Sequence, residues 1–164
     1  MAVVECRDQG AVRVITLNRP DQLNALNTET LVAMRAALAD AAHDSGVRCL
    51  VLTGAGRGFC AGADVDEWAS KKETPPEHDW VAEATAMVQE LHALSVPTLA
   101  MIDGAAVGAG LDLALACDFR LATARSKFIC AYTNIGYPPD CGGSWLMPRI
   151  IGLEAAKRFA YTGE

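Results

Sequence analysis

The chain has 164 residues, of which 51% are hydrophobic and 21% are charged. This is enough apolar material for one globular core, so we expect a single domain over residues 1–164 and exclude a disordered tail or a coiled coil. The 14 Lys and Arg residues are outnumbered by 20 Asp and Glu residues, giving a net charge of −6. This balance argues against a nucleic-acid-binding protein, because such binding depends on basic side chains.

The first predicted elements are a strand, a helix and a second strand. Residues 11–17 are apolar and β-branched, which favours a strand. The apolar spacing from Thr28 predicts an amphipathic helix, capped by Asn27 or Thr28 and stopped near Gly46. Residues 49–52 are apolar without alternation. That pattern is typical of a strand in a parallel sheet with both faces covered.

Glycine-rich turns, at 54–64 and 103–110, separate the later elements, and a polar loop is expected at 70–79. The remaining predicted elements are helices at 80–94 and 111–117, a strand at 98–102, strands at 119–122 and 127–130, and helices at 141–151 and 153–161. This alternation of strands and helices indicates an α/β fold.

The six cysteines form no C-x-x-C pair, and no His stands at the spacing of a metal ligand pair, so we expect no metal site. Asp103, Asp112 and Asp118 interrupt the most apolar stretches before they reach the length of a membrane span. No signal peptide is evident at the N-terminus. We therefore expect a cytoplasmic protein with reduced thiols and no membrane contact.

The usual glycine-containing catalytic motifs are absent. Gly54 and Gly56 fit the start of G-x-G-x-x-G, but Phe59 occupies its last position, and no P-loop motif is found. Ser144 lacks the final glycine of G-x-S-x-G, because Leu146 stands there. Dinucleotide binding, P-loop chemistry and serine hydrolysis are therefore excluded as first hypotheses.

Two turns of small residues remain, at 61–64 and 108–112. If both face one pocket, the backbone N–H groups of Ala63 and Ala109 can bind one oxygen from two sides, which is the arrangement of an oxyanion hole. The alternative is that these small residues only permit tight turns between strand and helix.

The chain resembles the crotonase superfamily, also called the enoyl-CoA hydratase/isomerase family, over nearly its whole length. The segments that carry the resemblance, in the family's order and spacing, are 18–20 with 24–26, 58–65, and 103–110 with 116–118. The resemblance implies a crotonase-like ββα spiral of the ClpP/crotonase type. It also implies an acyl-CoA thioester substrate, with coenzyme A entering only as part of that substrate and no other cofactor.

The resemblance further implies which residues form the site. The N–H groups of Ala63 and Ala109 would stabilise a thioester enolate. The substrate-binding residues that it implies are Leu26, Ala61, Asp64, Val65, Gly108 and Tyr132. Candidate cations for the CoA phosphates are Arg19, Arg57, Lys71 and Lys72.

Two aspartates are candidate catalytic acids. Family hydratases carry two glutamates, and their positions fall on Asp112 and Tyr132. Asp140, after a rigid Pro-Pro turn, resembles the acid that family isomerases use. A carboxylate in an apolar pocket can move a proton between carbons of a thioester, so we expect isomerisation with Asp140 as acid and base. Asp140 also fits as a helix cap, and Asp112 as an acid that favours a helix dipole.

Other functions stay open at this point. They are a hydratase that uses Asp112 and a non-catalytic acyl-CoA-binding or assembly subunit. A dehalogenase similar to the 4-chlorobenzoyl-CoA branch ranks lower, because Thr85 stands where that branch has a histidine. Relatives form trimers or hexamers, so a homo-oligomer is expected. They also carry a further helical region after the position of Glu164, so we expect the trimerisation helices to be largely absent here.

Overall fold

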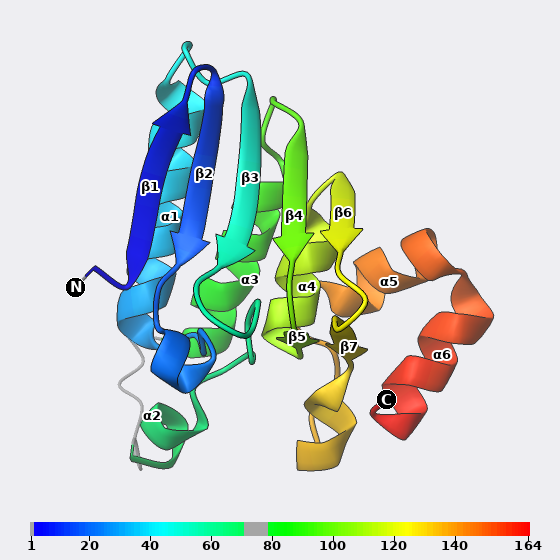
Figure 1. Cartoon of the computed structure of the whole chain (residues 1–164). Helices are drawn as coiled ribbons and strands as arrows, with labels where there is room; N and C mark the ends of the chain where they lie inside the picture. Colours follow the sequence, from blue (N-terminus) through cyan, green and yellow to red (C-terminus); the bar gives the residue numbers. More distant parts are fainter. Residues whose placement is uncertain (1, 71–78) are drawn as a thin grey trace.

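The computed structural model describes residues 2–70 and 79–164. Five strands form one sheet in the order β1-β2-β3-β4-β6 (Figure 1). The first pair is antiparallel and all other neighbours are parallel, as the apolar run at 49–52 predicted. The strands are β1 (Val4–Gln9), β2 (Val12–Leu17), β3 (Cys49–Gly54), β4 (Thr98–Ile102) and β6 (Phe119–Ala122).

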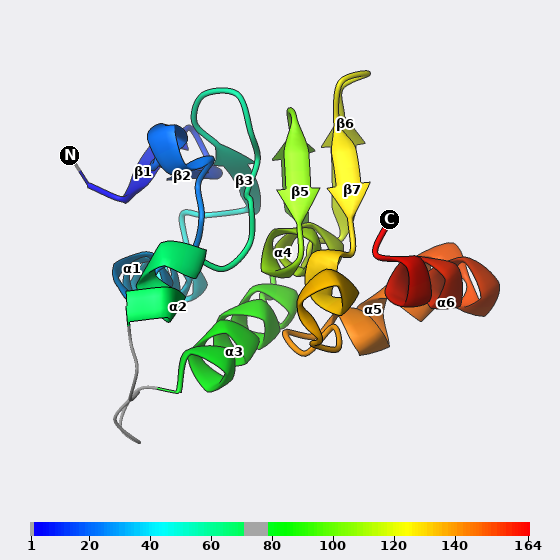
Figure 2. The same cartoon turned by 90° about the horizontal axis from the view of Figure 1, so that it is seen from below.

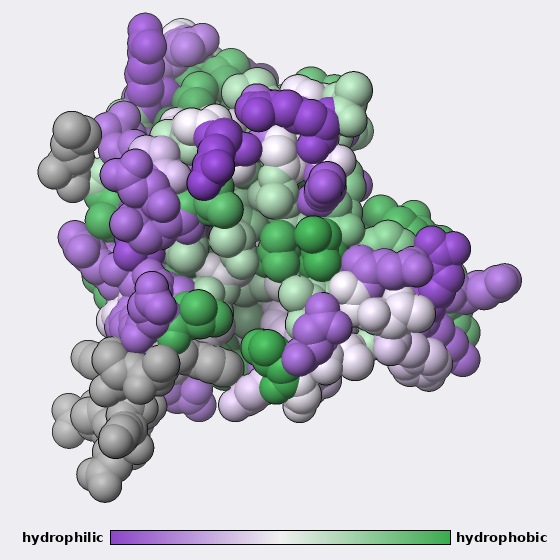
Figure 3. Space-filling view, turned by 60° about the horizontal axis from the view of Figure 1, so that its bottom comes forward, coloured by the Kyte–Doolittle hydropathy of each residue, from purple (hydrophilic) through white to green (hydrophobic). Residues whose placement is uncertain are grey.

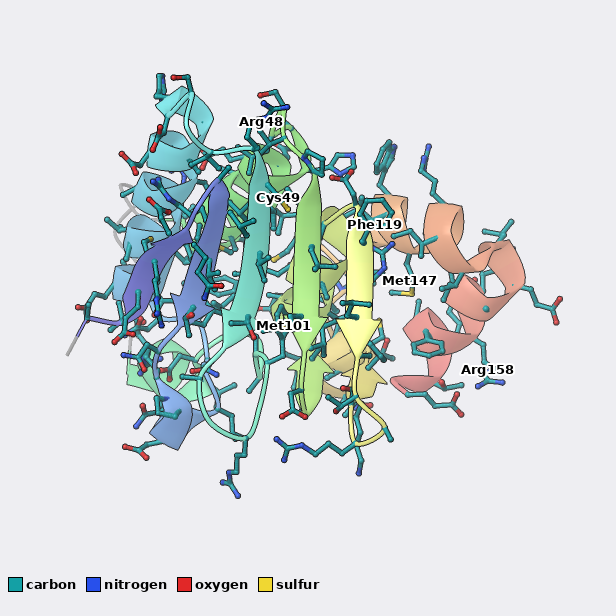
Figure 4. All side chains as sticks on the ribbon, turned by 45° about the horizontal axis from the view of Figure 1, so that its top comes forward. Arg48, Cys49, Met101, Phe119, Met147 and Arg158 are labelled. Carbon is teal, nitrogen blue, oxygen red and sulfur yellow. The ribbon has the colours of Figure 1, made fainter. Side chains whose placement is uncertain are left out.

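Three helices lie behind this sheet in Figure 1: α1 (Thr28–His43), α3 (Trp80–His92) and α4 (Ala109–Ala116). Alternate side chains of the strands point toward these helices and are fully buried, as Leu50 and Leu52 of β3 are. In the described part of the chain no helix covers the opposite face, so the expectation from residues 49–52 that both faces of the sheet are covered is wrong. There Met101 and Phe119 (Figure 4) are 46% and 63% exposed. The core therefore lies between the sheet and this single helix layer.

The remaining elements gather at the carboxyl ends of the parallel strands and beyond β6 (Figures 1 and 2). A second, two-stranded parallel sheet pairs β5 with β7. These elements are α2 (Val65–Ser70), β5 (Ala105–Val107), β7 (Lys127–Ile129), α5 (Gly143–Ile151), α6 (Leu153–Thr162) and 3-10 turns at Pro20–Gln22 and Ala131–Ile135.

The sequence patterns located the long elements and misjudged several short ones. Asn27 caps α1, its side chain accepting the N–H of Thr30. The turn expected at 103–110 contains β5, so that part of the prediction is wrong. Residues 71–78 of the expected polar loop lie outside the described residues.

The loops before the site are joined by a buried asparagine. Asn24 is 1% exposed and has a left-handed backbone, with φ 59°. Its Nδ2 donates to the carbonyl oxygens of Ala55 at 2.9 Å and Gly58 at 2.8 Å. Its Oδ1 accepts the N–H of Arg19 at 2.9 Å. One side chain therefore holds the loop after β2 against the loop after β3.

Replacing Asn24 with Ala should lower the free energy of unfolding by about 3 kcal/mol, because the buried carbonyl of Gly58 and the partly buried carbonyl of Ala55 lose their donor and alanine disfavours the left-handed backbone. Urea denaturation measures this change. The matched control is Gln22→Ala at a nearby exposed position, which should stay within about 0.5 kcal/mol of wild type. Equal stability of Asn24→Ala and the control would contradict this role.

Candidate functional site

A cavity of about 190 Å³ lies at the carboxyl ends of the parallel strands. Figure 3 views this end of the molecule and shows hydrophobic residues, in green, in the middle of a face bordered by hydrophilic ones. The cavity walls come from the loops after β3 and β5, the start of α3, and the segment between β7 and α5. The lining residues are Ala61, Gly62, Ala63, Val65, Trp80, Val81, Val107, Gly108, Ala109, Ala131, Tyr132, Asn134, Ile135, Tyr137 and Asp140.

Two glycines let the loop after β3 touch the start of α4. A Cβ on Gly62, whose φ is 89°, would lie 2.7 Å from the carbonyl oxygen of Val107 and 3.5 Å from the nitrogen of Ala109. A Cβ on Gly110 would lie 2.7 Å from the Cβ of Cys60. Any larger residue at either position would push the two segments apart. This contact brings Ala63 and Ala109 to one cavity.

The N–H groups of Ala63 and Ala109 donate no hydrogen bond within the described residues. Ala109 is the first residue of α4 and follows Gly108, so no earlier turn of the helix supplies a partner. The N-terminal end of a helix also carries positive potential. Two open donors on one cavity wall can therefore bind an oxygen that gains negative charge.

Asp112 lies behind the cavity wall, in the first turn of α4, and its side chain does not line the cavity. It is fully buried, and its Oδ2 accepts the hydroxyl of Tyr132 at 2.7 Å. Its Oδ1 has no hydrogen-bond partner of good geometry among the described residues, although the backbone of Gly143 lies beside it. Tyr132 does line the cavity and separates Asp112 from it.

Burial raises the pKa of Asp112 to about 6. The hydrogen bond from Tyr132 and the backbone of Gly143 oppose this increase, while the charge of Asp140 adds to it. Burial also raises the pKa of Tyr132 far above its ordinary value, so its phenol stays protonated at neutral pH.

Asp140 lines the cavity wall and is half-buried. Its Oδ1 accepts the thiol of Cys141 at 3.5 Å. The interpretation of Asp140 as a helix cap is wrong, because α5 begins at Gly143 and its cap is Gly142, with no side-chain hydrogen bond. The carboxylate is thus not used to start a helix.

Two of the predicted substrate-binding residues do not line the cavity. Leu26 is fully buried, and its carbonyl accepts the N–H of Asp64 and the indole N–H of Trp80. Asp64 binds the Arg19 guanidinium at 2.8 Å and accepts two N–H groups at the start of α2. Although burial opposes them, these contacts hold the pKa of Asp64 below its ordinary value.

The candidate cations are placed differently from one another. The guanidinium of Arg19 is engaged by Asp64 and by the carbonyl of Ala25, whereas Arg57 is exposed. Lys71 and Lys72 lie outside the described residues. No three His, Cys, Asp or Glu side chains within 2–70 and 79–164 are grouped to hold a metal ion, and no helix there is long and apolar enough to span a bilayer.

Sequence reasoning missed Trp80 and Tyr137 as lining residues. Trp80 matched the apolar face of a helix, and Tyr137 preceded two prolines, so each had a structural explanation. A Trp directly after the capping Asp79 was the available signal, because a first-turn side chain lies at a helix end near the loops.

Comparison with known proteins identifies relatives over almost the whole chain. Residues 12–164 match the family model described as enoyl-CoA hydratase/isomerase. The 1,2-epoxyphenylacetyl-CoA isomerase of Escherichia coli is 39% identical over 93% of this chain and 59% of its own length. The short-chain-enoyl-CoA hydratase of Clostridium acetobutylicum is 34% identical over 95% of this chain and 60% of its own length.

Solved structures of other proteins have the same fold as this chain. The structure of the Pseudomonas aeruginosa protein PA4980 has a TM-score of 0.93 and 44% identity, over 100% of this chain and 71% of that one. An enoyl-CoA hydratase from Bacillus anthracis gives a TM-score of 0.92 at 33% identity, over 99% of this chain and 63% of that one. The crotonase-like α/β fold expected from the sequence is confirmed. The chain spans about 59% of the length of the first curated relative.

The pH dependence of stability should report the burial of Asp112. Because its pKa is raised to about 6, the native state holds a proton that the unfolded state releases near pH 4. The protonated side chain of Asp112 therefore makes its full contribution to the free energy of unfolding below pH 4. This contribution is lost as the pH rises through 6. Between pH 4 and 7 wild type should lose about 3 kcal/mol relative to Asp112→Asn. Urea denaturation of both proteins across this range measures the difference, and a constant difference would contradict the burial of an ionisable acid.

Proposed function

This chain belongs to the enoyl-CoA hydratase/isomerase family, and on that premise we propose that it moves the double bond of an acyl-CoA thioester, with Asp140 as acid and base. The observation that carries the proposal is the position of Asp140. This residue lines a cavity whose other lining residues are small, apolar, aromatic or amide-bearing. A base in such surroundings is less solvated than in water and can reach a carbon-bound proton.

The reaction begins with the thioester carbonyl oxygen accepting the N–H groups of Ala63 and Ala109. This lowers the energy of the enolate, because negative charge develops on that oxygen. The Asp140 carboxylate takes a proton from the α-carbon of a 3-enoyl thioester, and the electron pair of the broken C–H bond delocalises onto the carbonyl oxygen to give a dienolate. The protonated Asp140 then gives this proton to the γ-carbon, the carbonyl re-forms, and the double bond lies between the α- and β-carbons of the resulting 2-enoyl thioester.

The remaining contacts bind the substrate. Ala61, Val65 and Gly108 line the cavity beside the two alanines, so the thioester passes along the loop after β3. Trp80 and Tyr137 supply apolar surface for the acyl group. The site needs no cofactor beyond the coenzyme A of its substrate. We also propose that the chain works in the cytoplasm, as its scattered cysteines suggest, and that it forms a homo-oligomer, a trimer or a hexamer, as the family resemblance implies.

Hydration through Asp112 is the second candidate. The observation that favours it is the pKa of Asp112 near neutrality together with its hydrogen bond to Tyr132, which reaches the cavity. Against it, the carboxylate itself does not line the cavity. A binding subunit would keep the two N–H donors and show no turnover.

The test is conversion of 2-enoyl-, 3-enoyl- and saturated acyl-CoA thioesters in deuterated water, followed by mass spectrometry. Wild type should convert 3-enoyl to 2-enoyl thioester, and Asp140→Asn should lower kcat by about a hundred- to ten-thousand-fold, because the amide cannot accept the proton. Asp112→Asn is the matched control and should keep most of the isomerase rate.

Conversion that survives in Asp140→Asn would contradict the assignment of the base. Hydration that is lost only in Asp112→Asn would move the chemistry to the second candidate. Binding of CoA thioesters without conversion or deuterium uptake would favour a binding subunit.

A further inference from the structure

Asp140 lies in a short segment that is pressed between two helices. Pro138 and Pro139 restrict the backbone before it. After it, a Cβ on Gly142, whose φ is 113°, would lie 3.1 Å from Val88 of α3. A Cβ on Gly143 would lie 2.9 Å from the Cγ of Asp112 on α4. Figure 2 shows this orange segment beside α3. The path of the backbone at residue 140 is therefore set by packing on both sides.

Two polar groups hold Asp140 itself. The hydroxyl of Thr85, on α3, donates to the backbone carbonyl of Asp140 at 3.3 Å. The thiol of Cys141 donates to Oδ1 of the Asp140 side chain at 3.5 Å. The second carboxylate oxygen, Oδ2, accepts no hydrogen bond from the described residues. One carboxylate oxygen thus has a hydrogen-bond donor, and the other has none among the described residues.

The thiol is suited to remain a donor. Cys141 is fully buried, and burial together with the nearby charges of Asp112 and Asp140 raises its pKa well above the ordinary value. A group that stays protonated can only donate to a carboxylate, and it does not compete for the proton that the carboxylate takes. The hydroxyl of Thr85 is uncharged and likewise does not compete for that proton. Neither group is placed on the cavity wall.

We propose that Thr85 and Cys141 are positioning residues that fix the backbone and one carboxylate oxygen of Asp140, leaving Oδ2 as the atom that exchanges the substrate proton. This inference rests on the proposed function for its catalytic consequence. Neither residue touches the substrate, so their loss should change the rate of proton transfer and not the binding of the thioester. Sub-ångström displacement of a base is sufficient to slow a reaction of this kind.

The test uses two pairs of variants. Thr85→Val keeps the volume of the side chain and removes the hydroxyl, whereas Thr85→Ser keeps the hydroxyl. Cys141→Ala removes the donor, whereas Cys141→Ser keeps one. Thr85→Val and Cys141→Ala should each lower kcat about tenfold with KM changed by less than about twofold, and the two serine variants should restore the rate. Cys6→Ala removes an exposed thiol in β1 and controls for the loss of a cysteine.

Two results distinguish the loss of Asp140 positioning from a general loss of stability. Thermal unfolding should not rank the variants as kcat does, and an equal loss of kcat in the serine variants would overturn the proposal. Wild-type kcat in both Thr85→Val and Cys141→Ala would also overturn it. A rise of KM with unchanged kcat would place these groups in substrate binding and overturn it too.

Infrared spectroscopy tests the hydrogen bond from the Cys141 thiol to Asp140 without measuring turnover. The S–H stretching band that disappears in Cys141→Ala should lie at lower frequency than that of a free thiol, and it should move in Asp140→Asn, because an amide oxygen is a weaker acceptor than a carboxylate. A band that does not respond to Asp140→Asn would overturn the proposal even if wild type is active. If wild type converts no substrate, the proposed function fails, and this band still decides whether the thiol holds the carboxylate.

Discussion

The close contact of two backbone segments, the loop after β3 and the N-terminus of α4, is the constraint on which the site depends. It exists because Gly62 and Gly110 have no Cβ at positions where one would overlap the opposite chain. An isolated bridge between Cys60 and Ala106 also pairs the loop after β3 with β5, the strand that directly precedes α4. Without this contact, Ala63 and Ala109 would not line one cavity, and their open N–H groups would have no common target.

The two aspartates near the site differ through their surroundings. Asp112 is sealed behind Tyr132, where burial favours its neutral form. Asp140 lies on the wall itself, on a segment that α3 and α4 hold in place. One fold thus separates a buried acid, which lowers stability when it ionises, from an acid that lines the cavity. The residue that joins the two environments is Cys141, which lies next to Asp140 and close to the charge of Asp112.

Much of the fold followed from the sequence, because long periodic segments commit to one structure locally. The apolar spacing of α1 and α3, and the unalternating run of β3, identified those elements. The three-residue strand β5 escaped prediction, since a glycine-rich segment carries no periodicity and β5 exists only through its pairing with β7. The helix cap assigned to Asp140 failed for a related reason: two successive glycines start α5 without a capping side chain.

Some features of the site could likewise be predicted from the sequence, and others could not. Small-residue turns predicted the positions of Ala63 and Ala109, because backbone donors need no side chain. Leu26 and Asp64 lie outside the cavity, since their backbone and side-chain groups are used to join the loop after β2 to the start of α2. Such contacts link residues far apart in the chain and leave no local pattern. The contacts of Thr85 and Cys141 with Asp140 likewise could not be predicted, because they depend on the packing of α3 against the segment before α5.

The proposed reaction depends above all on polarisation of the thioester carbonyl by the N–H groups of Ala63 and Ala109. Infrared difference spectroscopy of a saturated acyl-CoA with a ¹³C-labelled carbonyl, bound to the protein, reports this polarisation. The C=O stretch should lie at lower frequency than in water, and this shift should be lost in Gly110→Ala, whose methyl group would overlap Cys60. A carbonyl frequency of the bound thioester equal to that in water would show that the two N–H groups do not polarise it.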